Sequence, residues 1–508
     1  MNNSKLKVWI LLASIFLFAI NCSRTPKDNN ISYLQENLPH IIEKQMQDWH
    51  IPGLAVGIVK DDEVIFMKGF GYRDREKKLP VTTKTIFPIA SCSKSFTALS
   101  AYMMIEDSLI KLDRPLKEYM PDFQMYNDSA TSIATLRHFL AHRSGLGPNS
   151  IMPYLSGASG DEVFKRLKYF EPSGVIEKRL EYSNLGYSIA GRIVGKVKSM
   201  SWEDFVTERI FKPLRMKNAC FSMEDITKDG DYAISYVNFM DDQPVRFHDR
   251  RMTAYSPAGG IACDIEGMVS WLMFNLNEGK VGRKQLITPK NHRLMYQSVT
   301  KLSWPDDSLW TEQSIAYGWM NEKYRGHTSI YHGGLGDGFI SRVSFMPEEK
   351  IGVVVLTNMY YHLYEQAITY EIYDMLLGIS PSNQSDRMNK ECKEAVKAYR
   401  NSYNAFWDNS RPDTVSTEYL AKYTGKYSNP LYGQVSIYQN EEGLNISFES
   451  GLKVALHYYS ENRLATEDKS PDYSHIVFEF EFSDEFEAVA FTVPLEGGAE
   501  AYRFIRSF

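Results

Sequence analysis

The stretch that decides the fold reads Phe87-Pro-Ile-Ala-Ser91-Cys-Ser-Lys94-Ser-Phe-Thr-Ala-Leu-Ser100. Small and hydroxyl residues open it, and the apolar segment that follows through Met104 predicts a buried helix. Because residues three apart share one helix face, Lys94 is expected beside Ser91 if Ser91 stands at the helix entrance. A helix N-terminus carries partial positive charge and unpaired N–H groups, which lower the pKa of a partly buried ammonium and stabilise a nearby oxyanion. The pattern makes a nucleophilic serine plausible at Ser91.

The bare Ser-x-x-Lys motif is weak, because the sequence contains it five times, starting at Ser4, Ser91, Ser108, Ser298 and Ser450. Only the copy at Ser91 opens a long apolar helix after a strand-like approach that contains a proline. The alternative for Ser91 and Lys94 is structural: the serine caps the helix and the lysine extends into solvent. The motif alone leaves both interpretations open.

The composition is that of a globular protein with a large core. The chain has 508 residues, 43% of them hydrophobic and 13% aromatic, with a net charge of −6; no basic stripe indicates nucleic-acid binding. Apart from Cys22 the cysteines are widely spaced, without any C-x-x-C, which is not a zinc, iron–sulfur or disulfide framework. They are Cys92, Cys220, Cys263 and Cys392. A bridge between Cys220 and Cys263 stays possible in an oxidising compartment, and no motif predicts a cofactor.

Residues 1–22 have the parts of an export signal: two lysines, then an apolar run over 8–20 that is too short to span a bilayer comfortably. Ala19-Ile-Asn-Cys22 resembles a bacterial lipobox, although Asn21 replaces the usual small residue. We therefore expect an exported cell-envelope or periplasmic protein, anchored to the membrane through a lipid on Cys22, with residues 23–31 as a tether. An uncleaved N-terminal anchor is the alternative.

The next 350 residues predict one domain of mixed helices and strands, over 32–380. An amphipathic helix over 32–49 precedes a hairpin over 54–67, and three antiparallel strands over 329–356 precede a helix over 363–377. Residues 381–416 contain a charged helix and a polar run, and are predicted to be a linker. Residues 417–508 alternate apolar and polar residues in short segments, which predicts a second, all-β domain.

Two further stretches carry candidate site residues. Glu181-Tyr182-Ser183-Asn184 stands at the entry to a helix of small residues, where a phenol and an amide can both point into a cleft. The strand-like run from Ser329 contains His332-Gly333-Gly334-Leu335-Gly336. A phosphate loop would need a following helix with its lysine or G-x-G-x-x-G spacing. A close approach of the glycine backbone to a substrate fits better.

His138 and His142 are four residues apart, so they could in principle hold a metal. The zinc-protease pattern needs a glutamate after the first histidine, and Phe139 stands there. A helix that ends at Gly145, with His142 hydrogen-bonded near its end, is the better interpretation, and no metal is expected.

Taken in order, Ser91-Cys-Ser-Lys94, Tyr182-Ser-Asn184 and His332-Gly-Gly334 resemble the three active-site motifs of the serine β-lactamase and penicillin-binding protein family, in its class C-like branch. Supporting stretches lie between about residues 35 and 380: Ile51-Pro-Gly53, Gly69-Phe-Gly71, His142-Arg-Ser-Gly-Leu146, Pro213-Leu214, Pro257-Ala-Gly-Gly260 and Leu356-Thr-Asn358. The resemblance implies an α+β fold. The N-terminal hairpin and the later strands would share one antiparallel sheet, flanked by helices, with a helical region opposite and the site between them.

The resemblance also implies roles. Ser91 would attack a carbonyl to give an acyl-enzyme, and Lys94 with the phenolate of Tyr182 would take and return the proton. Asn184 would hold Lys94 and the substrate amide, and the backbone N–H groups of Ser91 and Leu335 would form the oxyanion hole. The expected substrate-binding residues are Asn184, His332, Gly333, Gly334 and Leu335.

One departure from the family concerns the substrate. The third motif often begins with lysine, whereas His332 is largely neutral at pH 7 and holds a substrate carboxylate less well. We therefore expect weak β-lactamase and carboxypeptidase activity, with an amide, a D-amino-acid peptide or an ester as the better substrate; peptidoglycan is one source of such peptides. Family members with histidine there look like D-aminopeptidases and esterases. The alternative is a sensor that binds penicillin or peptidoglycan without turnover.

The C-terminal domain, over 417–508, resembles the small lipocalin-like modules appended to some family members, which implies a barrel. It could cover the cleft or restrict substrate size, or it could serve stability or docking. The sequence leaves both roles open.

Overall fold

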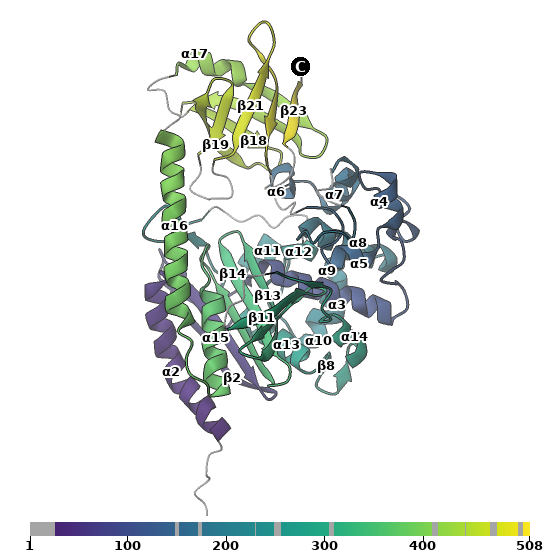
Figure 1. Ribbon diagram of the computed structural model, residues 1–508, viewed down its shortest axis with the longest axis vertical. Coiled ribbons are helices and arrows are strands. Elements are labelled where there is room, and N and C mark those ends of the chain that lie inside the picture. Colours follow the sequence, from purple (N-terminus) through teal and green to yellow (C-terminus); the bar gives the residue numbers. More distant parts are fainter. Residues whose placement is uncertain are drawn as a thin grey trace, which may run out of the picture.

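The computed structural model describes residues 26–508 except 148–151, 171–174, 229, 248–255, 304–308, 409–414, 442, 468–474, 496–500 and 508. Figure 1 shows a sheet with helices on its faces, a helical region beside it, and a small barrel that a long helix joins to the rest. This arrangement confirms the predicted α+β fold with an all-β C-terminal domain.

The main sheet has nine strands in the part of the chain that is described, in the order β10-β11-β12-β13-β14-β15-β1-β2-β3. They are β1 (Gly53–Lys60), β2 (Glu63–Asp74), β3 (Leu79–Pro80), β10 (Thr300–Lys301), β11 (Trp310–Ile315), β12 (Met320–Tyr324), β13 (His327–Gly336), β14 (Phe339–Met346) and β15 (Ile351–Thr357). Strand β1 pairs antiparallel with both β2 and β15. The predicted hairpin and the three later strands therefore share one sheet, as expected.

Helices cover both faces of this sheet. Because side chains alternate along a strand, Val56 packs with α2 (Pro26–Asp48) and α15 (Tyr364–Leu377), while Ala55 faces α13 (Ile265–Leu276). Gly57 lies on the α13 side, where an added Cβ would fall within 3.0 Å of the Val269 side chain. Strand β1 is buried along its whole length, which explains its continuous apolar sequence.

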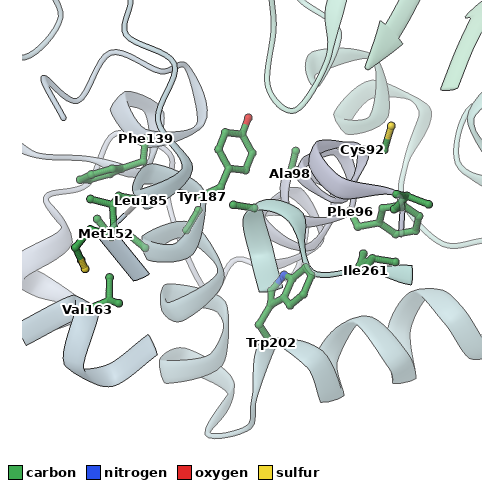
Figure 2. Close-up of a cluster of buried hydrophobic side chains, with 14 of the residues drawn as sticks. Cys92, Phe96, Ala98, Phe139, Met152, Val163, Leu185, Tyr187, Trp202 and Ile261 are labelled. Atoms are coloured by element: carbon green, nitrogen blue, oxygen red, sulfur yellow. The ribbon is translucent and has the colours of Figure 1, made fainter. Parts of the chain in front are cut away.

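The buried helix predicted after Ser91 is confirmed. A 3-10 turn, η1 (Ala90–Cys92), leads into α3 (Ser93–Glu106), and every residue from Ser93 to Met104 is buried. Figure 2 shows Phe96 and Ala98 among apolar side chains of the neighbouring segments, including Tyr187, Trp202 and Ile261. A helix that is buried on every side lies inside a domain, so α3 forms its centre and presents Ser91 at one end.

The helical region is built from short helices around α3. They are α4 (Asp128–Ile133), α5 (Leu136–Leu140), α6 (Met152–Ser156), α7 (Gly160–Arg166), α8 (Asn184–Lys198), α9 (Trp202–Val206), α10 (Lys212–Leu214), α11 (Met223–Lys228), α12 (Ser256–Gly259) and α14 (Pro289–Leu294). Short strand pairs join β4 (Phe87–Pro88) to β7 (Ala262–Cys263), β5 (Tyr236–Val237) to β6 (Val245–Arg246), and β8 (Lys280–Val281) to β9 (Lys284–Gln285). Helices α8 and α12 both pack on α3 and bring their residues to its N-terminal end.

The C-terminal domain is a closed, lipocalin-like barrel of eight strands within the described ranges. The strands are β16 (Gly425–Asn429), β17 (Gly433–Asn440), β18 (Gly443–Phe448), β19 (Lys453–Ser460), β20 (Arg463–Thr466), β21 (Val477–Phe482), β22 (Ala488–Val493) and β23 (Tyr502–Ser507). Buried aromatic rings fill the interior. The ring centroid of Phe491 lies 5.1 Å from that of Tyr427 and 4.8 Å from that of Phe504. An eight-stranded barrel is narrow enough for side chains to close it, so these rings form a packed core.

Two groups of contacts hold the barrel to the rest of the protein. The long helix α16 (Gln384–Asp408) stacks Phe406 on Tyr459 of the barrel, with ring centroids 4.5 Å apart. On the other side, Arg166 of α7 donates to the carbonyl of Leu431 at 3.1 Å, and the Ser450 N–H donates to the carbonyl of Leu155 at 3.1 Å. These contacts attach the barrel to α16 and to the helical region.

Two connecting segments are largely helical. Residues 26–31, expected as part of a tether, already belong to α2, because Pro26 suits the first turn of a helix and Ile31 packs against the core. The charged helix expected within the linker 381–416 is present as α16. The segment before Pro26, including Cys22 and the predicted signal, lies outside the described residues.

Two further observations concern a possible disulfide bridge and membrane-spanning helices. Cys92, Cys220, Cys263 and Cys392 are free thiols, so the possible bridge between Cys220 and Cys263 is not formed. Among the described residues, no helix combines the length and the apolar composition needed to cross a bilayer.

Candidate active site

Ser91 lies in a tight turn at the mouth of α3. Its side chain is partly exposed, whereas Cys92 and the residues that follow are buried. The preceding residue, Ala90, has φ +42°, which is unusual for a residue with a side chain. Backbone strain of this kind persists only where surrounding contacts enforce it, and it is often found at functional sites. Here β4 pairs with β7, and the Ile89 N–H donates to the carbonyl of Ile261 at 3.0 Å.

Lys94 lies one turn further along the chain and points at Ser91. Its Nζ is 2.9 Å from Ser91 Oγ, 2.7 Å from Asn184 Oδ1 and 2.7 Å from the carbonyl oxygen of Ala258. Lys94 is fully buried, and this burial lowers its pKa to about 7. The alternative of a solvent-exposed lysine is therefore wrong.

These contacts define what Lys94 can do when it is neutral. A neutral amine has two N–H bonds and one lone pair. The Asn184 amide oxygen and the Ala258 carbonyl oxygen can only accept, so they take the two N–H donors. The lone pair is then left for the third neighbour, Ser91, whose hydroxyl can donate to it. This geometry suits a general base that acts on Ser91.

Tyr182 completes the group. Its ring centroid lies 4.8 Å from Lys94 Nζ, and its hydroxyl hydrogen-bonds with Ser91. Burial raises the pKa of Tyr182 above its usual value, and the hydrogen bond to Ser91 offsets this only in part. The expected phenolate is therefore disfavoured at neutral pH, because a buried phenolate lacks the solvation that stabilises its charge. The arrangement favours Lys94 as the base and Tyr182 as a neutral proton relay.

Asn184 is the first residue of α8 and is held there by the helix cap. The Ser183 side chain accepts the Gly186 N–H at 3.3 Å, which begins the helix. The structure therefore places Asn184 against Lys94, as predicted from the second motif.

The third motif runs along β13 beside the Ser91 turn. The Cys92 thiol donates to the carbonyl of His332 at 3.1 Å, and the Ser341 hydroxyl donates to the carbonyl of Ile89 at 2.7 Å. Leu335 is 52% exposed at the end of this run. The three motifs thus meet in space, but the roles of Gly333, Gly334 and Leu335 toward substrate remain predictions.

The His332 side chain was expected to contact the substrate, but it is buried. It is 2% exposed, and its Nδ1 is 2.6 Å from the carbonyl oxygen of Gly333, to which it donates as Nδ1–H. Burial first, and then the positive charge of Lys94, lower the pKa of His332 to about 3. The imidazole is therefore neutral at pH 7 and has little surface to offer a substrate.

Gly334 is expected to be essential for the position of Ser91. A Cβ at Gly334 would lie within 3.0 Å of the carbonyl oxygen of Ile89, a backbone atom two residues before Ser91 that cannot rotate away. We expect Gly334→Ala to lower kcat/KM for an ester by about 100-fold, because a displacement of about 1 Å can have that effect. Gly336→Ala is the matched control on the same strand, since its nearest neighbour, the Ala90 Cβ, would lie at an ordinary contact distance of 3.5 Å. Equal activity of the two variants would contradict this prediction.

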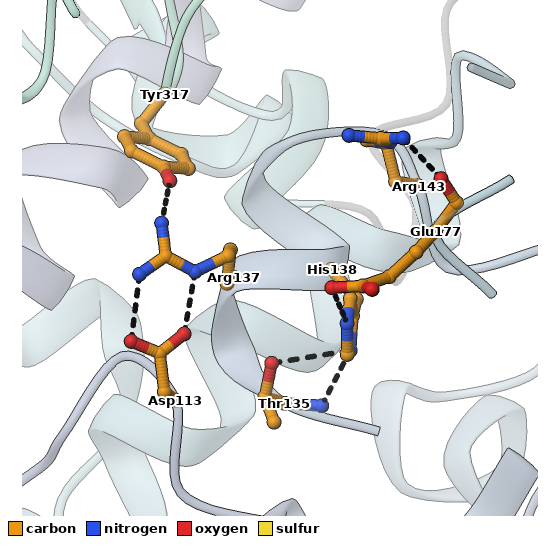
Figure 3. A network of polar contacts seen from close by, with 7 residues as sticks. All are labelled: Asp113, Thr135, Arg137, His138, Arg143, Glu177 and Tyr317. Carbon is orange, nitrogen blue, oxygen red and sulfur yellow. Dashed lines mark hydrogen bonds and ion pairs between the residues drawn. The ribbon is translucent and has the colours of Figure 1, made fainter. Parts of the chain in front are cut away.

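His138 and His142 bind different protein partners. His138 Nδ1 accepts the Thr135 N–H at 3.0 Å, which leaves Nε2–H to donate to Glu177 at 2.9 Å (Figure 3). His142 Nδ1 accepts the Ser183 N–H at 3.0 Å. Both ring nitrogens of His138 are thus engaged, which does not fit the metal-pair alternative.

Two contributors to the site were not predicted as such. The Ala258 carbonyl binds Lys94, and His142 stacks on Tyr182 with ring centroids 4.3 Å apart. Both belong to stretches that support the family resemblance, Pro257-Ala-Gly-Gly260 and His142-Arg-Ser-Gly-Leu146. Only their positions in those two stretches could have indicated a role in the site. Every residue has a backbone carbonyl, so the type of residue 258 does not show that its carbonyl binds Lys94.

Comparison with known proteins gives consistent matches. The family model described as Beta-lactamase matches residues 38–372. The protein flp of Staphylococcus aureus strain MW2 is 25% identical over 367 residues, which cover 68% of this chain and 69% of flp. The unguisins hydrolase ungD' of Aspergillus campestris is 24% identical over 434 residues, which cover 80% of this chain and 78% of that protein. Among solved structures, the octameric penicillin-binding protein homologue from Pyrococcus abyssi has a TM-score of 0.62 at 22% identity, over 93% of this chain and 99% of that one.

Proposed function

The chain belongs to the β-lactamase family, and from this premise we propose that it is a serine hydrolase that acts through an acyl-enzyme on Ser91. The observation that carries the proposal is the buried amine of Lys94, 2.9 Å from Ser91 Oγ with a pKa lowered to about 7. An activated nucleophile needs a base of this kind within hydrogen-bond reach.

In the proposed reaction, neutral Lys94 takes the proton of Ser91 as Oγ bonds to the substrate carbonyl carbon. The carbonyl electron pair moves onto oxygen, where the N–H groups of Ser91 and Leu335 would stabilise it. When the bond to the leaving group breaks, the proton passes from Lys94 to that group, with the Tyr182 hydroxyl as relay. A water molecule then repeats the sequence on the acyl-enzyme and releases the acid.

For the substrate we propose an ester, an amide or a D-amino-acid peptide in preference to a β-lactam. The support is the state of His332, which is buried and neutral and so supplies no positive charge for a substrate carboxylate. A permanent cation at that position would favour penicillins and D-alanyl-D-alanine peptides, which carry one. Turnover of nitrocefin at rates typical of a dedicated β-lactamase would contradict this preference.

The test is the covalent intermediate itself. The full chain, purified in detergent, is mixed with p-nitrophenyl acetate and quenched in acid, and its mass is measured over time. We expect an adduct of one acetyl group, located by peptide mapping to Ser91, that forms and then decays as product accumulates. An adduct that never decays would favour the non-turnover sensor, and hydrolysis without an adduct on Ser91 would overturn the proposal.

We also propose an exported protein of the cell envelope, anchored through Cys22. The support is the order of the lysines, the apolar run over 8–20 and the lipobox-like Ala19–Cys22. Metabolic labelling with a fatty acid should mark the protein and should be lost in Cys22→Ser. Labelling that persists in this variant would contradict the anchor.

A further inference from the structure

We propose that His142 is a positioning residue that fixes the Tyr182 side chain in place beside Ser91 and Lys94. The inference rests on the proposed function, since it concerns the proton relay of that reaction. It follows from three contacts that a single residue makes around Tyr182: one to the N–H of the residue before it, one to the N–H of the residue after it, and one to its ring.

The backbone contacts come first. The Glu181 N–H donates to the carbonyl of His142 at 2.8 Å, and the Ser183 N–H donates to His142 Nδ1 at 3.0 Å. His142 therefore binds the residues on both sides of Tyr182. Its backbone has a φ of +56°. A residue with a side chain adopts this conformation only where surrounding contacts compensate it.

The ring contact is the third. The His142 and Tyr182 rings are stacked, with centroids 4.3 Å apart and planes 23° from parallel. The His142 ring also lies 5.0 Å from Tyr187, whose hydroxyl donates to the carbonyl of Leu140 at 2.8 Å. The phenol of Tyr182 thus rests on an imidazole that is itself fixed, while Lys94 Nζ lies 4.8 Å from the centre of the phenol ring.

The hydrogen bond from Ser183 also determines the protonation of His142. Because Nδ1 accepts an N–H, the ring proton must lie on Nε2, and a doubly protonated ring would lose the bond. Burial first, and then the positive charge of Lys94, lower the pKa of His142 well below its ordinary value. The side chain therefore stays a neutral acceptor while Lys94 gains and loses its proton.

The discriminating experiment is a double-mutant cycle. His142→Phe keeps a ring to stack but removes the acceptor, and Tyr182→Phe removes the hydroxyl that His142 would position. The rate of acylation by p-nitrophenyl acetate is measured for the native protein, both single variants and the double variant. We expect His142→Phe to slow acylation about 10- to 100-fold in the native background and by less than about twofold in the Tyr182→Phe background.

A residue with a merely structural role would give the same loss in both backgrounds, and that result would overturn the inference, as would no loss in the native background. His142→Asn is the second variant: asparagine tolerates positive φ and offers an amide oxygen to Ser183. It should retain more activity than His142→Phe, and it carries the same cycle if the phenylalanine variant fails to fold. Failure of the native protein to acylate would instead count against the proposed function.

Discussion

Ser91→Ala is expected to lower kcat/KM for p-nitrophenyl acetate by about 10⁴-fold or more, to the level of the uncatalysed reaction helped only by binding. The reason is that Ser91 Oγ is the hydroxyl that lies 2.9 Å from the Lys94 amine. Without it, no acyl-enzyme forms at this site, and a fluorophosphonate probe should no longer label the protein. Steady-state hydrolysis and probe labelling measure the two effects independently.

Ser95→Ala is the matched control. Ser95 lies in α3, one turn beyond Ser91, but it is buried and its hydroxyl donates to the carbonyl of Cys92 at 2.7 Å. Its loss removes one hydrogen bond, worth about 1 kcal/mol of stability, and should leave labelling intact. If Ser91→Ala were still labelled, or if Ser95→Ala lost labelling while folded, Ser91 would not be the nucleophile.

Local patterns were sufficient to predict the elements that carry the site. Ser91, Lys94, Tyr182 and Asn184 lie at helix entrances, where small and polar residues precede an apolar run, so the sequence marks them. The strands β13 to β15 alternate or are continuously apolar, and their pairing was predicted. Strands β11 and β12 were not, because they lie toward one edge of the sheet and carry exposed or half-buried polar residues such as Glu312 and Lys323.

Properties that depend on burial were predicted only in part. The sequence analysis expected a neutral His332, but the phenolate expected at Tyr182 did not take into account the neighbours that exclude water. Burial raises the pKa of Tyr182, against the expected phenolate, and lowers the pKa of His332. The contact of the Ala258 carbonyl with Lys94 and the contacts of His142 around Tyr182 join segments that are far apart in the chain. No local residue pattern predicts such contacts.

The expected pH profile of the native enzyme follows from the Lys94 environment. The reactive form of Lys94 is the neutral amine, and its pKa is lowered to about 7. As the pH falls below about 7, protonation removes the base, so log kcat/KM should decrease with a slope of one. Above about 7 it should reach a plateau, because the pKa of Tyr182 is raised and those of His142 and His332 are lowered, so that none of the three gains or loses a proton just above pH 7.

Lys94→Met is expected to reduce kcat/KM at pH 8 by about 10³- to 10⁴-fold, as for the loss of a well-placed general base, and to abolish the decrease below pH 7. Methionine fills a similar volume but has no lone pair that can take the Ser91 proton. Lys84→Met is the matched control: Lys84 is exposed and precedes the same turn, so its variant should keep both the rate and the profile. A Lys94→Met enzyme that retained a decrease centred near pH 7 would show that another group is the base. The decrease of kcat/KM below pH 7 thus tests the link between burial and catalysis. An amine exposed to water would be protonated at neutral pH, whereas α3, α8 and α12 keep Lys94 from water, so that it can be neutral and accept the Ser91 proton.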